Sequence, residues 1–511
     1  MATVHSFDVF DTCLLRMCAF PSDIFFEVGY RLASGSCPEE RAAFAEDFRA
    51  ARIQAERAAR RKADREDTTL VEIWRELAPK IPLDDWQSGM EVELETERQH
   101  LRPNRRVLAT VRAARQASAR ILFVSDMYLP AEFIREQLQC HGFLEPGDGL
   151  FVSSDAGVCK RSGNLFRHIL RIEGIAAASL HHFGDNPVSD VSAPQALGIS
   201  AELAPEAELD PCERGLLNGS LNHRHVSSKL AGRCRVFRLS GEAGDTNRSL
   251  VAAFLGPFLL TFASWVLTEA RRDGIRRLYF LSRRCYLLSR MARILAPRFG
   301  IECHYLYLSC FVKALAASPV RDRLASKIEE RRAQALRYFE QELDPFDAWA
   351  LVDLGWRLTS QAALRLLLER PVRGYYLGLH GERTSPTEAG YAAGLFYYES
   401  GDRLAAAPPQ IFGRIDLPRH LVGLAPHGTV HHYEPSNSGM VPVCSDVKGP
   451  MRELLASLER HLEQFAEANS CLADEIGDTS AARDILDTLT ATFVAQPERA
   501  VRLGISPKPV A

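Results

Sequence analysis

Residues 4–12 read VHSFDVFDT, a short apolar run that ends in two carboxylates and a hydroxyl. Its valine and phenylalanine content favours a buried strand. The same layout returns in ILFVSD (121–126), GLFVSSD (149–155) and LHHFGDN (180–186), with helical sequence between successive runs. Strands that alternate with helices predict a Rossmann-like, doubly wound parallel sheet of the α/β class. Functional residues are then expected at the carboxyl ends of the strands.

The rest of the chain divides by composition around this predicted sheet. Residues 1–205 are expected to form its domain, with a helical cap inserted at about 17–100, where Ala, Arg and Glu are abundant. The irregular segment 206–234 predicts a linker. Strand–helix alternation resumes in 235–445 and predicts a second Rossmann-like α/β domain, and 446–511 predicts a mostly helical tail.

Overall composition limits the class of protein. The formal net charge of −3 favours neither nucleic acid nor an anionic membrane as a partner. The 12 cysteines form no CxxC pair, which predicts reduced thiols and a cytoplasmic location. Residues 250–267 are apolar and barely long enough to span a membrane. Arginines lie on both sides of this run, so we expect a buried helix and no membrane span.

Groups suited to phosphoryl transfer follow the predicted strands in a fixed order: Asp8, Ser125, Lys160, Asp185 and Asp190. A carboxylate such as Asp8 can attack phosphorus, and a divalent ion lets it approach an anionic ester. Carboxylates suit Mg²⁺, while a hydroxyl and an ammonium can hold the remaining oxygens. Each residue alone could be an ordinary turn residue, but the ordered set predicts one site.

Four segments resemble the sequence motifs of haloacid dehalogenase (HAD) superfamily hydrolases. They are SFDVFDTCLLR (6–16), VSDMYLP (124–130), SSDAGVCKRSGNLF (153–166) and FGDNPVSD (183–190). More narrowly, they are similar to a subgroup of predicted hydrolases with DxFDT and SDMYLP motifs, often linked to glycosyltransferases of surface polysaccharide synthesis. Residues 235–445 also resemble the C-terminal portion of that subgroup, although YFLSRRC (279–285) departs from its pattern.

The resemblance implies a role for each motif residue. The catalytic residues would be Asp8 as nucleophile, Asp11, Ser125 and Lys160. The Mg²⁺ ligands would be Asp8, the backbone carbonyl of Phe10, Asp185 and Asp190. The substrate-binding groups would be Thr12, Ser125, the amide of Asp126 and Lys160. The helical cap would close on the core and select the substrate.

One position departs from the pattern of the usual phosphatase. The general acid is expected two residues after the nucleophile, where this chain has Phe10, and a carboxylate follows one residue later as Asp11. Neighbouring side chains on an extended strand point to opposite sides, so Asp11 cannot simply substitute. The substrate could carry a good leaving group such as an acyl phosphate, or a turn could bring Asp11 round, or the chemistry could be dehalogenation. The two acidic residues Asp185 and Asp190 favour the metal-dependent explanations, because carboxylate attack on carbon needs no Mg²⁺.

The second half offers one further candidate, at the end of the predicted strand ALVDLGW (350–356). Asp353, Thr359 and Ser360 could form an anion site at a helix start, or Asp353 could cap a turn and Thr359 the helix. Taken together, the sequence predicts a Mg²⁺-dependent phosphohydrolase that acts through an aspartyl-phosphate on a small phosphorylated metabolite. A glycosyltransferase is a possible partner. The alternatives are a phosphoryl or glycosyl transferase that uses both domains, and a scaffold with a degenerate site.

Overall fold

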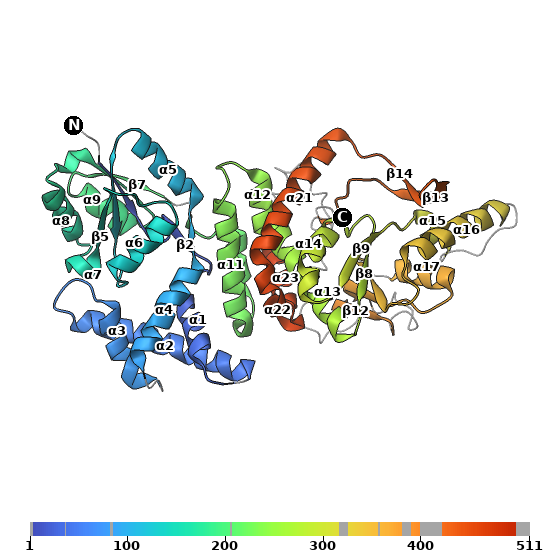
Figure 1. Cartoon of the computed structure of the whole chain (residues 1–511), viewed down its shortest axis with the longest axis horizontal. Helices are drawn as coiled ribbons and strands as arrows, with labels where there is room; N and C mark the ends of the chain where they lie inside the picture. Colours follow the sequence, from blue (N-terminus) through green and yellow to red (C-terminus); the bar gives the residue numbers. More distant parts are fainter. Residues whose placement is uncertain are drawn as a thin grey trace. The chain divides into compact units, whose positions relative to one another are not determined.

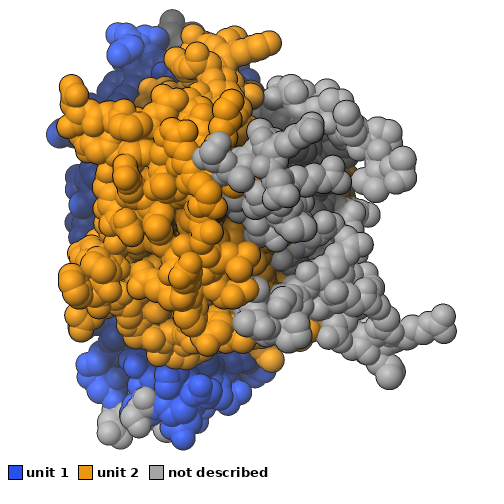
Figure 2. Space-filling model, turned by 90° about the vertical axis from the view of Figure 1, so that its right-hand side faces the viewer, with its two compact units in different colours: residues 1–217, 227–245 blue, residues 218–226, 246–511 orange. Residues whose placement is uncertain are grey.

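A computed structural model describes residues 4–35, 37–81, 85–204, 207–315, 325–355, 358–380, 390–398 and 422–496. The chain divides into two compact units (Figure 2). The first unit comprises residues 1–217 and 227–245, and the second comprises 218–226 and 246–511. The end of the predicted tail, PKPVA, lies outside the described residues.

The first unit is built on a parallel sheet with the strand order β5-β4-β1-β6-β7. Its strands are β1 (Val4–Asp8), β4 (Arg120–Ser125), β5 (Gly149–Val152), β6 (Leu180–Gly184) and β7 (Ser200–Leu203). The central strands are buried on both faces, which explains their near-continuous apolar sequence. From β1 the chain first builds β4 and β5 on one side and then β6 and β7 on the other. This change of direction places the ends of β1, β4 and β6 at a topological switch point, where open α/β sheets bind ligands.

Helices cover this sheet and form the cap as a separate group beside it (Figure 1). The cap helices are α1 (Asp23–Leu32), α2 (Pro38–Lys62), α3 (Leu70–Leu77) and α4 (Trp86–His100). The other helices of the unit are α5 (Arg105–Gln116), α6 (Ala131–Cys140), α7 (Ser153–Ala156), α8 (Asn164–Glu173), α9 (Ala193–Gln195), α10 (Pro211–Gly215) and α11 (Arg224–Leu239). Helix α3 begins with a capping box in which Thr69 and Glu72 satisfy each other's backbone amides.

Two short strands form the neck of the cap. β2 (Leu14–Arg16) and β3 (Leu101–Pro103) pair antiparallel, so the chain enters and leaves the cap side by side. Arg16 lies buried in this neck, and its guanidinium forms two hydrogen bonds of 3.0 Å to the Glu97 carboxylate. One hydrophobic cluster contains residues of both sheet and cap, including Phe123 and Trp74. The cap is therefore packed on the core through a continuous apolar contact.

The second unit holds another parallel sheet, with the order β12-β11-β10-β8-β9. Its strands are β8 (Arg277–Leu281), β9 (Glu302–Leu306), β10 (Trp349–Asp353), β11 (Gly374–His380) and β12 (Ala392–Tyr398), and β13 (Val430–Ser436) and β14 (Gly439–Cys444) form a hairpin. Its main helices are α12 (Thr246–Leu250), α13 (Gly256–Arg272), α14 (Tyr286–Leu295), α15 (Cys310–Leu315), α16 (Ala325–Glu342), α17 (Thr359–Leu368), α21 (Gly449–Asn469), α22 (Ala473–Ile476) and α23 (Thr479–Val494). The two parallel sheets, the helical cap and the helical tail confirm the predicted α/β fold class.

Two segments test particular predictions from the sequence. The apolar run expected to be a buried helix lies within a helical stretch, Thr246–Arg272, whose most apolar window is wholly buried inside the protein. The segment 206–234, expected to be an irregular linker, instead contains α10 and most of α11. Leu230, Cys234 and Phe237 of α11 are buried at helical spacing. The preceding Gly, Asn and Ser residues obscured this pattern in the sequence.

Candidate active site

The predicted site residues of the first unit meet at one edge of its sheet. Asp8 ends β1, Ser125 ends β4, and Asp185 follows directly after β6. Lys160 lies in the loop between α7 and α8, and Asp190 lies in a π-helical turn, Pro187–Ser192. All five line a single pocket of about 680 Å³. The pocket is lined mainly by charged and polar side chains, so it suits a small and strongly polar ligand.

Lys160 bridges two of the carboxylates. Its Nζ donates a hydrogen bond to Asp8 Oδ1 and another, of 2.6 Å, to Asp190 Oδ1. All three side chains are at least nine-tenths buried. Burial disfavours the ammonium, but the charges of Asp8 and Asp190 raise the pKa of Lys160 above its usual value. Lys160 therefore stays protonated and provides a fixed positive charge at the pocket floor.

Three carboxylates at the pocket could hold a divalent cation. Oxygens of Asp8, Asp185 and Asp190 lie within 4.8 Å of one another. Burial raises the pKa of Asp8 well above its usual value, and burial together with the charges of Asp11 and Asp190 raises that of Asp185 to about 6. The Lys160 ammonium and the hydrogen bond from His182 lower the pKa of Asp190 despite its burial. The ammonium therefore compensates one carboxylate of this cluster and not all three. Closely spaced carboxylate oxygens with uncompensated charge are the donors that Mg²⁺ prefers, so the residues fit the predicted ion.

The turn after β1 brings Asp11 into the same pocket as Asp8. Asp11 has a positive φ of 57°, and the turn is closed by a 2.8 Å hydrogen bond from its amide to the Leu14 carbonyl. A non-glycine residue rarely adopts this conformation. Side chains alternate between the two sides of an extended strand, and the left-handed conformation of Asp11 interrupts this alternation. Asp11 therefore does not have to point away from the side of Asp8. The turn therefore brings the Asp11 carboxylate to the pocket, and its role as the acid stays a prediction.

Asp11 also faces a cation that the sequence did not suggest. Arg235 of α11 places Nη1 3.6 Å from Asp11 Oδ1, and its Nη2 donates to the carbonyls of Arg16 and Cys18 at 3.1 Å. Arg235 is only 5% exposed. A buried guanidinium that holds the cap neck therefore also holds the Asp11 side chain. The helical spacing of apolar residues in α11 could have predicted this helix from the sequence, and with it the burial of Arg235.

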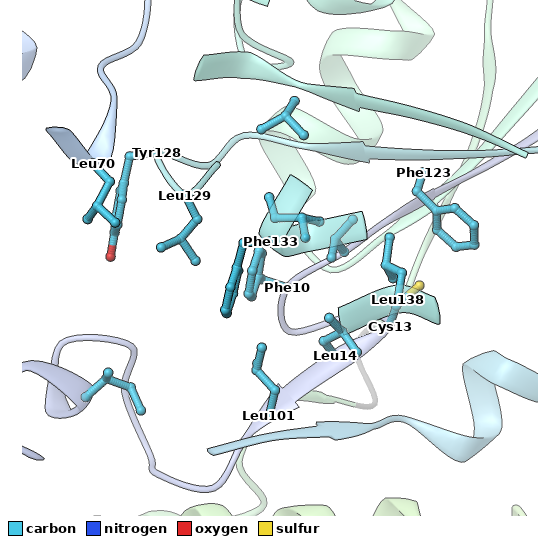
Figure 3. Packing of buried hydrophobic residues seen from close by; sticks show 14 of the residues in the cluster. Phe10, Cys13, Leu14, Leu70, Leu101, Phe123, Tyr128, Leu129, Phe133 and Leu138 are labelled. Carbon is cyan, nitrogen blue, oxygen red and sulfur yellow. The ribbon is translucent and has the colours of Figure 1, made fainter. Parts of the chain in front are cut away.

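Phe10 lies between Asp8 and Asp11 in the sequence, but its side chain has an apolar environment. Its ring is buried in the main hydrophobic cluster, and Figure 3 shows it among Phe133, Leu14 and Leu101. The guanidinium carbon of Arg16 lies 4.6 Å from the centre of this ring. Phe10 also contributes to the pocket lining. The ring thus fixes the turn on the core, and the role of the Phe10 carbonyl as a metal ligand stays a prediction.

The predicted phosphate-binding residues divide into two groups. Ser125 and Lys160 line the pocket, as does Asp126, whose carboxylate accepts hydrogen bonds from the backbone amides of Lys160 (2.7 Å) and Arg161 (3.4 Å). Thr12 is different, because it is buried and does not itself line the pocket. Its hydroxyl donates a long hydrogen bond of 3.4 Å to Asp185 Oδ1. Thr12 therefore supports a candidate metal ligand and does not contact the substrate space.

His182 forms a hydrogen bond with the carboxylate of Asp190. Its Nε2 lies 3.1 Å from Asp190 Oδ1, and its Nδ1 lies 2.8 Å from Ser6 Oγ. A carboxylate only accepts, so Nε2 carries the proton, and burial lowers the pKa of His182 and keeps the ring neutral. Gly184 lies beside the same carboxylate, and a Cβ there would meet Asp190 Cγ at 2.4 Å. Nothing in the local sequence links His182 to Asp190, so this contact could not be predicted from it.

The candidates in the second unit show a simpler arrangement. Asp353 ends β10, and its carboxylate accepts hydrogen bonds from the Gly355 amide and the Ser360 hydroxyl, both at 3.1 Å. This agrees with the turn-capping explanation of Asp353. The predicted helix cap by Thr359 is wrong, because Thr359 is the first residue of α17 and Leu358, which has no capping side chain, takes the cap position. The left-handed backbone of Leu358 sets this helix start.

Comparisons with known proteins found no matching family model and no matching curated protein. Several solved structures are similar to part of the chain. A 2-haloacid dehalogenase from Pseudomonas syringae pv. Tomato DC3000 is 18% identical, with 40% of this chain and 87% of that chain covered and a TM-score of 0.29. The L-2-haloacid dehalogenase PA0810 is also 18% identical, with 39% and 82% covered and a TM-score of 0.29. A HAD family enzyme from Bacteroides thetaiotaomicron, in a magnesium complex, is 12% identical, with 40% and 93% covered and a TM-score of 0.28. Similarity at this level assigns no activity to the chain, so its function must be inferred from the site.

Proposed function

We propose that the first unit is a Mg²⁺-dependent phosphohydrolase of the HAD superfamily that acts on a small phosphorylated metabolite. One observation carries the proposal: Asp8, Ser125, Lys160, Asp185 and Asp190, which lie far apart in the sequence, line one polar pocket. A phosphate monoester is anionic and small, and it matches a pocket that offers a nucleophile, a hydroxyl and an ammonium together.

The residues can take distinct parts in the reaction. An oxygen of Asp8 attacks phosphorus and forms an aspartyl-phosphate, while the bond from phosphorus to the leaving oxygen breaks. Asp11, in the same pocket, supplies the proton that the leaving oxygen needs. Ser125 and Lys160 contact the phosphoryl oxygens, and water then hydrolyses the aspartyl-phosphate and returns Asp8 as a carboxylate.

Magnesium would be held by Asp8, Asp185 and Asp190, with the Phe10 carbonyl as a further ligand. When bound, it supplies positive charge that lets a carboxylate approach an anionic ester. Thr12 and His182 would orient two of these carboxylates through their hydrogen bonds.

The resemblance to the DxFDT and SDMYLP subgroup narrows the proposed substrate, pathway and partner. It favours a sugar phosphate as substrate, in glycan or secondary-metabolite biosynthesis, and a glycosyltransferase as partner. The polar lining of the pocket supports a hydroxyl-rich substrate of this kind.

Turnover of phosphate esters tests the proposal. The purified chain is assayed for phosphate release from a panel of sugar phosphates, alkyl phosphates and acyl phosphates, with Mg²⁺ and with a chelator. We expect turnover that requires Mg²⁺, and we expect Asp8→Asn to lower kcat by about 10⁴- to 10⁶-fold. Asp47→Asn, an exposed change on α2, is the matched control and should leave kcat unchanged.

Each alternative predicts a different result in this assay. Without an acceptor, a transferase that uses both units would release phosphate only in a burst. An added acceptor alcohol would take the phosphoryl group in place of water. A scaffold would show no turnover of any ester, and this result would refute the proposal. A dehalogenase would release halide from 2-haloacids in the presence of chelator, which would leave Asp185 and Asp190 without a catalytic part.

A further inference from the structure

The loop that carries Lys160 is held from two sides through three consecutive backbone amides. The amides of Lys160 and Arg161 donate to Asp126, which follows β4 of the core. The amide of Cys159 donates to Glu66 Oε2 at 2.7 Å. Glu66 belongs to the cap, in the segment between α2 and α3. The core and the cap therefore hold this loop together.

Glu66 makes most of the contacts on the cap side. Besides the Cys159 amide, its carboxylate accepts hydrogen bonds from Ser162 Oγ at 2.6 Å and Asn164 Nδ2 at 2.5 Å. Its own amide donates to the Gly157 carbonyl at 3.1 Å. The contacts of Glu66 thus reach from Gly157, at the start of this loop, to Asn164, the first residue of α8. Burial slightly opposes ionisation, but the hydrogen bonds from Ser162 and Cys159 lower the pKa of Glu66, and the charged form strengthens these bonds.

The residues that follow Glu66 dock on the neighbouring loops of the core. Asp67 is buried and accepts a hydrogen bond of 2.5 Å from Ser153 Oγ, which itself accepts one of 2.8 Å from the Met127 amide. The Leu70 amide donates to the Tyr128 carbonyl at 2.9 Å. The segment 66–70, which we name the strap, therefore contacts the loops after both β4 and β5. Ser125 is the last residue of β4, directly before the first of these loops, and Lys160 lies in the segment that follows β5 and α7.

We propose that Glu66 is a positioning residue that couples the docking of the cap to the placement of Lys160. When the strap is docked, the loop 157–164 is fixed and the Lys160 ammonium lies between Asp8 and Asp190. When the strap leaves, the Cys159 amide and the Asn164 side chain lose their acceptor, and the Ser162 hydroxyl loses one of its two acceptors. The backbone of the loop is then tied to the core through Asp126, and the Lys160 ammonium through its bonds to Asp8 and Asp190. The site is then complete only with the cap closed. This inference rests on the proposed phosphohydrolase function and deepens it by naming how the cap regulates the site.

Variants of Glu66 separate positioning from general stability. Glu66→Ala removes the acceptor, Glu66→Gln keeps one acceptor oxygen, and Glu91→Ala is a matched control at an exposed position of α4. We expect Glu66→Ala to lower kcat about 10- to 100-fold, with little change in the unfolding temperature, because a displaced catalytic group costs rate while the fold persists. Glu66→Gln should recover most of the rate, and Glu91→Ala should match the wild-type protein.

Hydrogen exchange provides a readout that does not depend on activity. In Glu66→Ala, backbone amides of residues 157–164 should exchange faster, while peptides from β1 and β6 should be unchanged. Unchanged kcat together with unchanged exchange in this loop would overturn the proposal. Faster exchange throughout the first unit, with a lowered unfolding temperature, would also overturn it, because Glu66 would then be a structural residue only. If the wild-type protein hydrolyses no ester, faster exchange confined to 157–164 still supports the positioning of this loop by Glu66. The absence of turnover would then contradict the proposed function alone.

Discussion

Asp11 shows how a single backbone angle decides what a site can do. A positive φ of 57° places its side chain at the pocket that also contains Asp8. A residue with this conformation costs about 1 kcal/mol or more and persists only where its surroundings hold it. Arg235 at 3.6 Å and the hydrogen bond to Leu14 provide that support. Residues held in rarely populated backbone conformations are more frequent at functional sites, which is consistent with the proposed role of Asp11.

Asp11→Asn tests whether this carboxyl group is the general acid. The amide cannot supply a proton, so we expect kcat for an alkyl phosphate to fall by about 10²- to 10⁴-fold. The loss should be much smaller for p-nitrophenyl phosphate, because its leaving group departs without protonation. Steady-state kinetics with both esters measures the difference. An equal loss with the two esters would mean that Asp11 acts in another way.

At the scale of elements, the neck of the cap connects the turn that carries Asp11 to the helical insertion. β2 and β3 lie side by side, and the buried pair of Arg16 and Glu97 spans from the neck to α4. The Arg16 guanidinium also covers the ring of Phe10. The neck, the turn and the last cap helix are therefore one packed assembly, in which loss of a single carboxylate leaves a buried cation.

Glu97→Ala tests the strength of this assembly. The change leaves the Arg16 guanidinium buried without its carboxylate, so we expect the free energy of unfolding of the first unit to fall by about 3–5 kcal/mol. Glu95→Ala on the same helix removes the partner of an exposed pair with Arg98 and should cost less than about 1 kcal/mol. Denaturant unfolding of the two variants measures the difference. Equal losses would show that the buried pair has no special part in stability.

At the scale of the whole molecule, the two units have separate sheets and separate cores. The cluster around Phe7 and Trp74 belongs to the first unit, and the cluster around Tyr279 and Tyr433 belongs to the second. Multi-domain proteins of this kind often unfold in more than one step. The three carboxylates that could hold Mg²⁺ all belong to the first unit.

Mg²⁺ should therefore stabilise only one of the unfolding transitions. A ligand at about 100 times its Kd adds about 2.7 kcal/mol to the stability of the unit that binds it. Differential scanning calorimetry with Mg²⁺ and with chelator should show one transition shifted upward and the other unchanged. Asp185→Asn should remove the shift. A shift that survives this variant would place the ion elsewhere.

The sequence by itself determined the α/β class and the set of residues at the strand ends. Buried parallel strands must be apolar along their whole length, so β1, β4 and β6 stand out as short runs, and their polar ends mark one edge of the sheet. Asp8, Ser125 and Asp185 were predicted on this basis. Lys160 and Asp190 were added by their order along the chain, and the structure places all five in one pocket.

Only the tertiary structure decided which other groups reach that pocket. β2 and β3 are three residues long, too short for a periodic pattern, and their pairing joins segments separated by the whole cap. His182 on Asp190, Arg235 beside Asp11 and Glu66 on the Lys160 loop are contacts between residues that no local spacing connects. A sequence pattern reports which face of a strand or helix is apolar. Which polar residues meet across the fold depends on how the packed elements bring their ends together.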